Sequence, residues 1–345
     1  MKRALLIGGA GFIGHNLALA LKKNGLEVLV VDGLEVNNLV SLQDSRATFA
    51  NREFYIRVLE ERLTLLRNAQ IPVHVEDARD YQRLNKVVNE FQPHVVFLLA
   101  AVAHASRANK DPYSTFDHSF RTLENTLDIM RSLPNPCQLV FFSSSMVYGN
   151  FLGNTPDEDT YCDPRNIYGA LKLGGEKLAL AYSNVFDFPV TIVRPSALYG
   201  PRCISRRVIQ IFIENALRSQ DLVIKGDGQE ELDFTFIDDL VSGLISLTLN
   251  PVAYGEVFNM TRGQSESLLT AAKTVQKYFP SSGIKHEPRD VLNPERGALC
   301  IDKAHELLNY SPLHDLVSGI EKYISWYQEA WVENLDSGVA SEGNE

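Results

Sequence analysis

Short apolar runs alternate with helical patterns over the first 194 residues of the chain. The runs are apolar on both faces, which is typical of strands buried in a parallel sheet. Strands that alternate with helices favour an α/β fold, and we predict a Rossmann-type doubly wound parallel sheet. The predicted strands cover residues 4–7, 27–32, 73–76, 95–99, 139–142 and 190–193.

The pattern is more mixed after the sixth predicted strand. Short strands are expected near residues 222–225 and 256–259, and helices at 206–218, 238–248, 265–279 and 315–330. We therefore divide the chain into three parts. They are a cofactor-binding Rossmann domain over 1–194, a smaller mixed α/β substrate-binding part over 195–332, and a polar, frayed tail over 333–345.

A long connection, residues 33–72, separates the second and third predicted strands. Short loops and one helix would be enough there. Apolar and charged residues alternate with helical spacing between Phe54 and Leu66, which predicts an amphipathic helix near the adenosine end of a bound cofactor. We favour an extra packed helix over a lid or a partner surface.

The glycine segment Gly8-Gly9-Ala10-Gly11-Phe12-Ile13-Gly14 joins the first predicted strand to a helix. Glycines in this context permit a tight turn and let the backbone approach a pyrophosphate, which the first N–H groups of the helix receive. The second strand ends at Asp32, where a carboxylate hydrogen-bonds the adenine ribose diol. A glycine-rich turn that only closes a βα unit is the alternative. Because Asp32 would repel a 2′-phosphate, we predict NAD as the cofactor rather than NADP.

The composition limits the other possibilities. The formal net charge is −10 and no basic run occurs, so nucleic acid is not an expected partner. The four cysteines lack the spacing of metal ligands, which suggests free thiols in a reducing compartment and no metal site. The chain starts at its first strand and contains no apolar run near the ~20 residues of a membrane span. We therefore expect a cytoplasmic protein without a membrane partner.

A second signal is the pair Tyr168 and Lys172, which share a helix face because they are four residues apart. A nearby ammonium group lowers the pKa of a phenol and makes it a better base. Ser144 follows the fifth strand, whose carboxyl end faces the ligand crevice in such sheets, and its hydroxyl can hydrogen-bond the reacting oxygen. Each feature alone is typical of a solvated helix face or a turn, but together they indicate a catalytic set.

These motifs, with Ala100-Ala101, Arg194-Pro195-Ser196 and Asp233-Phe234-Thr235 further along, resemble those of extended short-chain dehydrogenases/reductases, in particular the NAD-dependent nucleotide-sugar epimerase/dehydratase family. The resemblance covers nearly the whole chain. It implies Tyr168 as the base, Lys172 as the anchor of the nicotinamide ribose and Ser144 as a contact of the substrate hydroxyl. It also implies a homodimer formed through a four-helix bundle that includes the Tyr168 helix. The implied cofactor contacts are Gly8, Gly11, Phe12, Ile13, Gly14, Asp32, Asp77, Ala78, Ala100, Ala101, Tyr168 and Lys172.

The departures from the family pattern indicate the reaction. Dehydratases of this family carry Asp-Glu where this chain has Ser145-Met146, and a thioether has no proton to exchange. The remaining Ser-Tyr-Lys set is sufficient for hydride transfer, so we predict C4 inversion of a nucleotide-diphosphate sugar through a transient 4-keto intermediate. A nucleotide 4-ketosugar reductase or C4 oxidase is the alternative. A catalytically silent NAD-binding regulator is a hypothesis of a different class.

Arginine side chains are expected to hold the substrate diphosphate. The family often has Asn at the position of Ala197 and Arg at that of Leu232, so other residues must serve. We name Arg206, Arg289 and Arg296, of which Arg289 matches a family position for this contact. A solvated surface arginine remains the alternative for Arg206 and Arg296, and also for Arg207 beside them.

Overall fold

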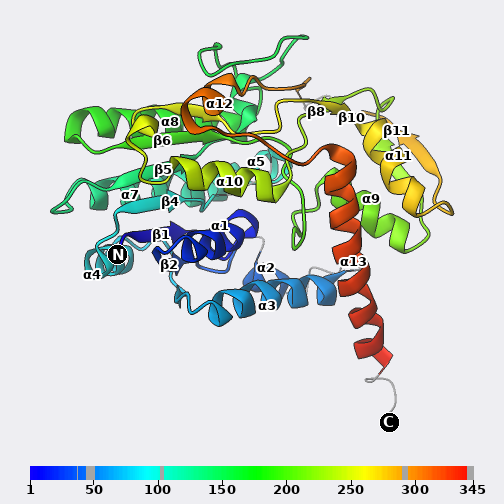
Figure 1. Ribbon diagram of the computed structural model, residues 1–345, viewed down its shortest axis with the longest axis horizontal. Coiled ribbons are helices and arrows are strands. Elements are labelled where there is room, and N and C mark those ends of the chain that lie inside the picture. The colour runs from blue at the N-terminus through cyan, green and yellow to red at the C-terminus, as the bar shows by residue number, and fades with distance from the viewer. Residues whose placement is uncertain (37, 44–50, 102–104, 290–293, 340–345) are drawn as a thin grey trace.

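In the computed structural model, residues 1–36, 38–43, 51–101, 105–289 and 294–339 are described. A seven-stranded parallel sheet runs through the centre, with strand order β3-β2-β1-β4-β5-β6-β9 (Figure 1). Its first six strands have the order of a doubly wound dinucleotide-binding fold, so the predicted fold class is confirmed. The strands are β1 (Arg3–Ile7), β2 (Glu27–Val31), β3 (Val73–His74), β4 (Val95–Leu98), β5 (Gln138–Phe142), β6 (Val190–Arg194) and β9 (Val257–Asn259).

Alternation along the strands divides the core between the two faces of the sheet. In β1, Leu6 belongs to one apolar cluster, whereas Leu5 and Ile7 belong to the other. This follows from the pleat, which points successive side chains to opposite faces. The first cluster includes residues of α1 (Phe12–Lys23), α3 (Arg52–Asn68), α9 (Val208–Leu217), α10 (Ile237–Leu247) and α13 (Leu316–Val339). The second includes residues of α4 (Tyr81–Phe91), α7 (Thr122–Met130) and α8 (Ile167–Phe186).

The part of the chain after residue 194 returns to the central sheet. β9 pairs in parallel with β6, so the predicted strand at 256–259 is the seventh strand of the sheet and not part of a separate layer. Two small sheets lie beyond it. β8 (Glu231–Leu232) pairs with β10 (Glu266–Ser267), and β7 (Leu222–Lys225) pairs with β11 (Ile284–Glu287). The helices of this region are α11 (Leu268–Tyr278) and α12 (Asp302–Leu308).

Some element ends differ from the sequence prediction. β3 ends at His74, and the next residue, Val75, is exposed on the surface. α13 continues to Val339, into the stretch 333–345 for which the sequence suggested a frayed tail. The remaining short elements are α2 (Leu39–Gln43), α5 (Ala105–Lys110), α6 (Pro112–Phe116), the π-helix η1 (Asp117–Arg121) and the 3₁₀-helices η2 (Ser145–Tyr148) and η3 (Pro251–Ala253).

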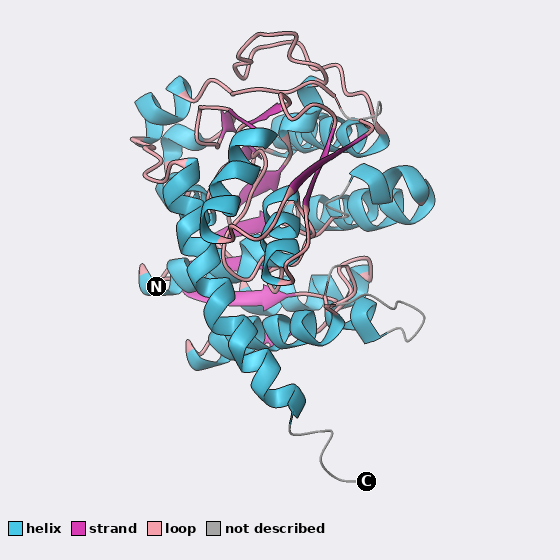
Figure 2. Cartoon of the chain, turned by 90° about the vertical axis from the view of Figure 1, so that its right-hand side faces the viewer, coloured by secondary structure: helices cyan, strands magenta, loops and turns pink. Residues whose placement is uncertain are grey.

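The 33–72 connection contains the expected amphipathic helix, α3, and it is packed against α13 (Figure 1). The Phe54 ring stacks on Tyr327 at a centroid distance of 5.6 Å and contacts Trp331 at 5.0 Å. Figure 2, seen from the α13 side, shows the strands of the central sheet behind this long helix. The buried side of α3 also includes a charged residue, Arg62.

Candidate active site

The glycine segment forms the turn between β1 and α1. Gly8 has φ +83°, and a Cβ there would lie 2.6 Å from the backbone nitrogen of Ala100. A Cβ at Gly14 would lie 2.5 Å from the Cα of Gly9. No side chain caps the first turn of α1 after Gly11, so its N–H groups are available to an anion. This cradle fits a pyrophosphate that approaches the backbone closely.

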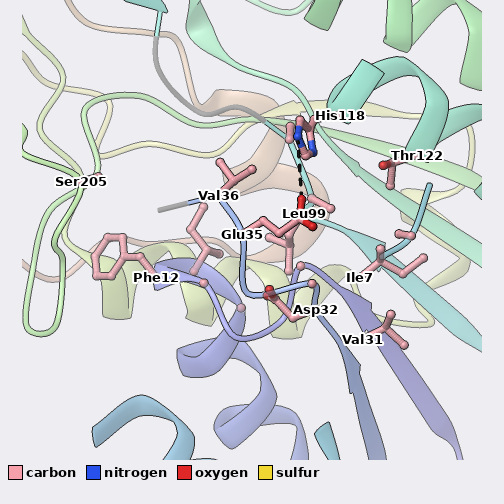
Figure 3. Close-up of a pocket in the computed structure, with 18 of the residues that line it drawn as sticks. Ile7, Phe12, Val31, Asp32, Glu35, Val36, Leu99, His118, Thr122 and Ser205 are labelled. Atoms are coloured by element: carbon pink, nitrogen blue, oxygen red, sulfur yellow. Dashed lines mark ion pairs between the residues drawn. The ribbon is translucent and has the colours of Figure 1, made fainter. Parts of the chain in front are cut away.

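A cavity opens at this turn, at the carboxyl ends of the parallel strands (Figure 3). We call it the cofactor pocket. It brings together every residue predicted to hold the cofactor except Tyr168 and Lys172. The predicted cofactor-binding residues that line the pocket are Gly8, Gly11, Phe12, Ile13, Gly14, Asp32, Asp77, Ala78, Ala100 and Ala101.

Asp32 lies at the end of β2, on the wall of the cofactor pocket. Its two carboxylate oxygens accept hydrogen bonds from the backbone N–H groups of Ala10, at 2.9 Å, and Leu34, at 2.8 Å. Burial raises the pKa of Asp32, while these hydrogen bonds and the positive charge of Arg62 oppose the rise. The carboxylate is therefore fixed by the glycine turn itself, in the position expected for a ribose contact.

Arg79 joins three segments at the rim of the cofactor pocket. Its guanidinium donates to Asp77 at 2.7 Å, to Asp117 of η1 at 2.8 Å and to Glu35 at 3.1 Å. Burial would raise the pKa of Asp77, but the hydrogen bonds from Arg79 lower it overall. His118 lines the pocket 4.0 Å from Glu35 (Figure 3).

The predicted catalytic residues meet beyond the end of β5. The Tyr168 phenol is hydrogen-bonded to the Ser144 side chain. Ser144 caps η2, and its Oγ accepts the backbone N–H of Met146 at 3.2 Å. Lys172, one turn after Tyr168 on α8, has its ammonium nitrogen 5.9 Å from the centre of the Tyr168 ring. The sequence prediction that these three residues converge agrees with this geometry.

The electrostatics of this set differ from the sequence prediction. Burial raises the pKa of Tyr168, and the groups that oppose the rise are Arg207 and Ser144 rather than Lys172. Lys172 is only 7% exposed, and burial lowers its own pKa to about 8. It donates to the carbonyl oxygen of Phe142 at 2.6 Å, which directs the ammonium toward the end of β5. The predicted lowering of the Tyr168 pKa by Lys172 was therefore wrong.

A buried ion pair holds α8 against the sheet beneath the catalytic residues. The guanidinium of Arg194 donates two hydrogen bonds to Glu176, at 2.9 and 2.7 Å. Ser143, next to Ser144, donates to the same carboxylate. Because planar, two-point pairing fixes orientation as well as distance, this network sets the relation between the end of β5 and α8.

The arginines divide differently from the sequence expectation. A second cavity adjoins the cofactor pocket and is lined by Arg207, Lys225, Glu230, Phe234 and Arg296, among others. We call it the substrate-side cavity. Arg207 lines both cavities. Arg206 and Arg289 line neither of them, because Arg206 lies near Tyr55 and Arg289 lies beside Gly226 and Glu295.

Sequence reasoning missed Arg62, which lines the cofactor pocket on the Asp32 side. One signal was available, because Arg62 lies seven residues after Tyr55 and four before Leu66, on the apolar stripe of the α3 helix. A charged residue at such a position is buried when the helix packs. On α8, Gly174 faces Phe120 and Gly175 faces Phe141 of the same chain.

The remaining described residues add no metal site or membrane span. No cluster of three or more His, Cys, Asp or Glu that could hold a metal occurs among them. Within the same ranges, no helix has the length and apolar character to cross a bilayer.

The family model described as NAD dependent epimerase/dehydratase family matches residues 4–261. The chain belongs to that family. Its cofactor is therefore NAD, as predicted, and the epimerase class is the one that its relatives favour.

Named relatives of this epimerase/dehydratase-family chain act on UDP sugars. It is 28% identical to the UDP-glucuronate 4-epimerase of Thermodesulfobacterium geofontis, over 94% of this chain and 96% of the relative. It is 29% identical to the UDP-N-acetyl-alpha-D-glucosaminuronate decarboxylase of Bacillus cytotoxicus, over 96% and 99%.

A solved structure, the UDP-glucuronic acid 4-epimerase of Bacillus cereus in complex with UDP-glucuronic acid and NAD, has a TM-score of 0.83 and 25% identity to this chain. The match covers 95% of this chain and 99% of the Bacillus cereus chain.

Proposed function

We propose that the protein inverts the configuration at C4 of a UDP sugar with tightly held NAD. The observation that carries the proposal is the convergence of Tyr168, Ser144 and Lys172 beyond the end of β5, with Met146 beside them. Arg207, which lines both cavities, is close enough for its charge to act on the Tyr168 phenol. The cradle at Gly8 and Gly14 fits the cofactor, as does the carboxylate of Asp32. The chemistry that NAD supplies when bound is reversible hydride transfer at the sugar carbon.

The residues of the chain handle the proton of the C4 hydroxyl. Tyr168 takes that proton as the base and gives it back to the same oxygen when the 4-keto group is reduced. Ser144 donates a hydrogen bond to the reacting oxygen and orients the phenol. Because burial raises the pKa of Tyr168, the positive charge of Arg207 supports catalysis by favouring the phenolate. Lys172 holds the nicotinamide ribose from the same helix.

Two arginines are proposed to receive the substrate diphosphate. Arg296 is half-buried, its buried Nε makes no hydrogen bond among the described residues, and its pKa falls to about 10, mainly because of desolvation. The positive charge of Arg207 lowers it further, whereas Glu230, 4.0 Å away, opposes the fall. Two cations that face one cavity favour a ligand with at least two negative charges. Arg207 and Arg296 would thus take the role of the arginine that the family often has at the position of Leu232.

Met146 distinguishes epimerisation from dehydration. The side chain is buried beside Ser144 and offers no group that could remove a proton from carbon. Configuration should therefore change without exchange of carbon-bound hydrogen with solvent.

The test is to incubate the enzyme with UDP-glucuronic acid, UDP-glucose and UDP-N-acetylglucosamine in D₂O and to analyse products by NMR and mass spectrometry. We expect C4 inversion of at least one sugar with unchanged mass. Deuterium at C3 or C5 would indicate a deprotonating enzyme. A product lighter by water would indicate a dehydratase, and one lighter by carbon dioxide a decarboxylase like the Bacillus cytotoxicus relative. Stoichiometric release of NADH would favour the oxidase or reductase alternative.

A homodimer through α8 is part of the proposal. Of the three charged residues on α8, Lys172 and Glu176 are buried, so Lys177 is the one charged side chain on its exposed face. A surface helix of this kind is typical of an interface. Sedimentation velocity at micromolar concentration should give a dimer, and a monomer would exclude it.

We also propose a cytoplasmic location, because all four cysteines are free thiols. Thiol titration of the denatured protein from its native source should find four.

A further inference from the structure

The loop over residues 201–207 lies between the two cavities. It follows the bridge between Tyr199 and Phe236 and ends at Arg207, the N-cap of α9. Ile204, Ser205 and Arg207 line the cofactor pocket, and Arg207 also lines the substrate-side cavity. The conformation of this loop therefore determines the position of the Arg207 side chain relative to the cofactor pocket and the substrate-side cavity.

The loop backbone is unusual at two positions. Arg202 has φ +64° and Arg206 has φ +52°. A side chain disfavours this left-handed region because its Cβ approaches the neighbouring carbonyl oxygen. Non-glycine residues stay there only when surrounding contacts fix them. The question is which part of the molecule supplies those contacts.

The first contact comes from Arg62 on α3. This side chain is 1% exposed, and it donates from Nε, at 3.1 Å, and from Nη2 to the carbonyl oxygen of Arg202. The guanidinium of Arg202 in turn donates to His15 of α1 at 3.1 Å and to Glu61 of α3 at 3.3 Å. α3 thus holds both the backbone and the side chain of the first left-handed residue.

The second contact also begins on α3, two turns earlier on the same face. The backbone N–H of Arg206 donates to Oε1 of Gln210 at 2.7 Å. The side-chain amide of Gln210 donates to the Tyr55 hydroxyl at 3.1 Å, and that hydroxyl donates to Glu214 at 2.8 Å. α3 is therefore connected to the second left-handed residue through one glutamine.

We propose that α3 is the support that positions the 201–207 loop and, through it, Arg207, with Arg62 as the principal positioning residue. An apolar residue at position 62 would fill the same space without the unfavourable desolvation of a buried guanidinium. The hydrogen bonds that Arg62 donates to the Arg202 carbonyl explain why a guanidinium, and not an apolar side chain, is buried at this position. The effect on substrate binding rests on the proposed function, whereas the effect on the loop does not.

The first experiment measures amide hydrogen exchange by mass spectrometry in the holoenzyme, without a nucleotide sugar. The variants are Arg62→Met and Tyr55→Phe, and the control is Arg67→Met, an exposed arginine at the end of α3 whose side chain donates to Thr64. We expect exchange in peptides covering 201–207 to rise about tenfold in Arg62→Met, as for the loss of a hydrogen bond to a charged group, and less in Tyr55→Phe. Both changes should be confined to the loop and the start of α9.

Unchanged exchange in the loop of both variants would overturn the proposal, as would an equal rise in Arg67→Met. Should Arg62→Met fail to fold, Tyr55→Phe decides, because it removes one hydroxyl and preserves the ring.

The second experiment is a double-mutant cycle with UDP as the probe. Arg62→Met and Arg207→Met should each weaken UDP binding by about tenfold or more. If Arg62 acts through Arg207, the double variant should bind no more weakly than Arg207→Met alone. Multiplicative effects in the double variant would refute positioning through Arg207. Failure of the unmodified enzyme to bind UDP would overturn the proposed substrate, and the exchange experiment would still test the role of α3.

Discussion

Lys172→Met should make the protein more stable at neutral pH and at the same time less active. The ammonium group is buried at the end of β5, and its hydrogen bond goes to the Phe142 carbonyl. Burial lowers its pKa from 10.5 to about 8, with Glu176 opposing the shift. The charged form is therefore less favourable in the folded protein than in the unfolded chain.

The size of the effect follows from the two pKa values. A difference from 10.5 to about 8 corresponds to about 3 kcal/mol of unfolding free energy at pH 7. Loss of the hydrogen bond to Phe142 costs about 1 kcal/mol. The variant should therefore gain about 2 kcal/mol at pH 7.

The sign of the pH dependence is also fixed. Between about pH 8 and 10.5 the unfolded chain binds this proton and the folded protein does not, so the stability of the unmodified protein rises with pH in that window. At pH 10 the advantage of Lys172→Met should have nearly disappeared.

Urea unfolding of the cofactor-free protein at pH 7, 8.5 and 10 measures this difference. The control is Lys23→Met, an exposed lysine at the end of α1 and outside the proposed dimer interface. A Lys172→Met variant that is less stable than the unmodified protein at pH 7, by an amount independent of pH, would refute the reasoning. Turnover of the same variant with saturating NAD⁺ should fall if the residue anchors the ribose, as we propose.

Three further predictions concern single residues. Tyr168→Phe should keep the fold and lower turnover by the ~10²–10⁴ typical of one positioned acid/base, so near-normal turnover would remove Tyr168 from the mechanism. Asp32 should make binding selective for NAD⁺ over NADP⁺ in a titration of the cofactor-free protein, and equal affinity would contradict this. Arg79→Gln should raise the rate of NAD⁺ dissociation about tenfold, because it releases three carboxylates at the pocket rim. Arg121→Gln, which breaks one exposed ion pair, is its control, and the same acceleration in both variants would exclude a role for the rim.

The sequence by itself determined the features that depend on local pattern. Gly8 to Gly14 predict the phosphate turn because only a glycine backbone permits that approach, and Asp32 follows from the length of one βα unit. Tyr168 and Lys172 were found because helical spacing brings them to one face. The same reasoning predicts that Met146 exchanges no proton.

The tertiary structure decided what depends on distant segments. It assigned Arg207 rather than Arg206 to the cavities, because Arg206 lies near Tyr55 of α3 instead. It also placed Arg62 beside Asp32, from a helix that the sequence could only describe as amphipathic.

The pKa of Tyr168 was also decided by the tertiary structure, because it depends on burial. Spacing predicted a lowered pKa for Tyr168, but desolvation raises it. Periodicity reports which face of an element is apolar, whereas charge and pKa depend on what the fold packs against that face.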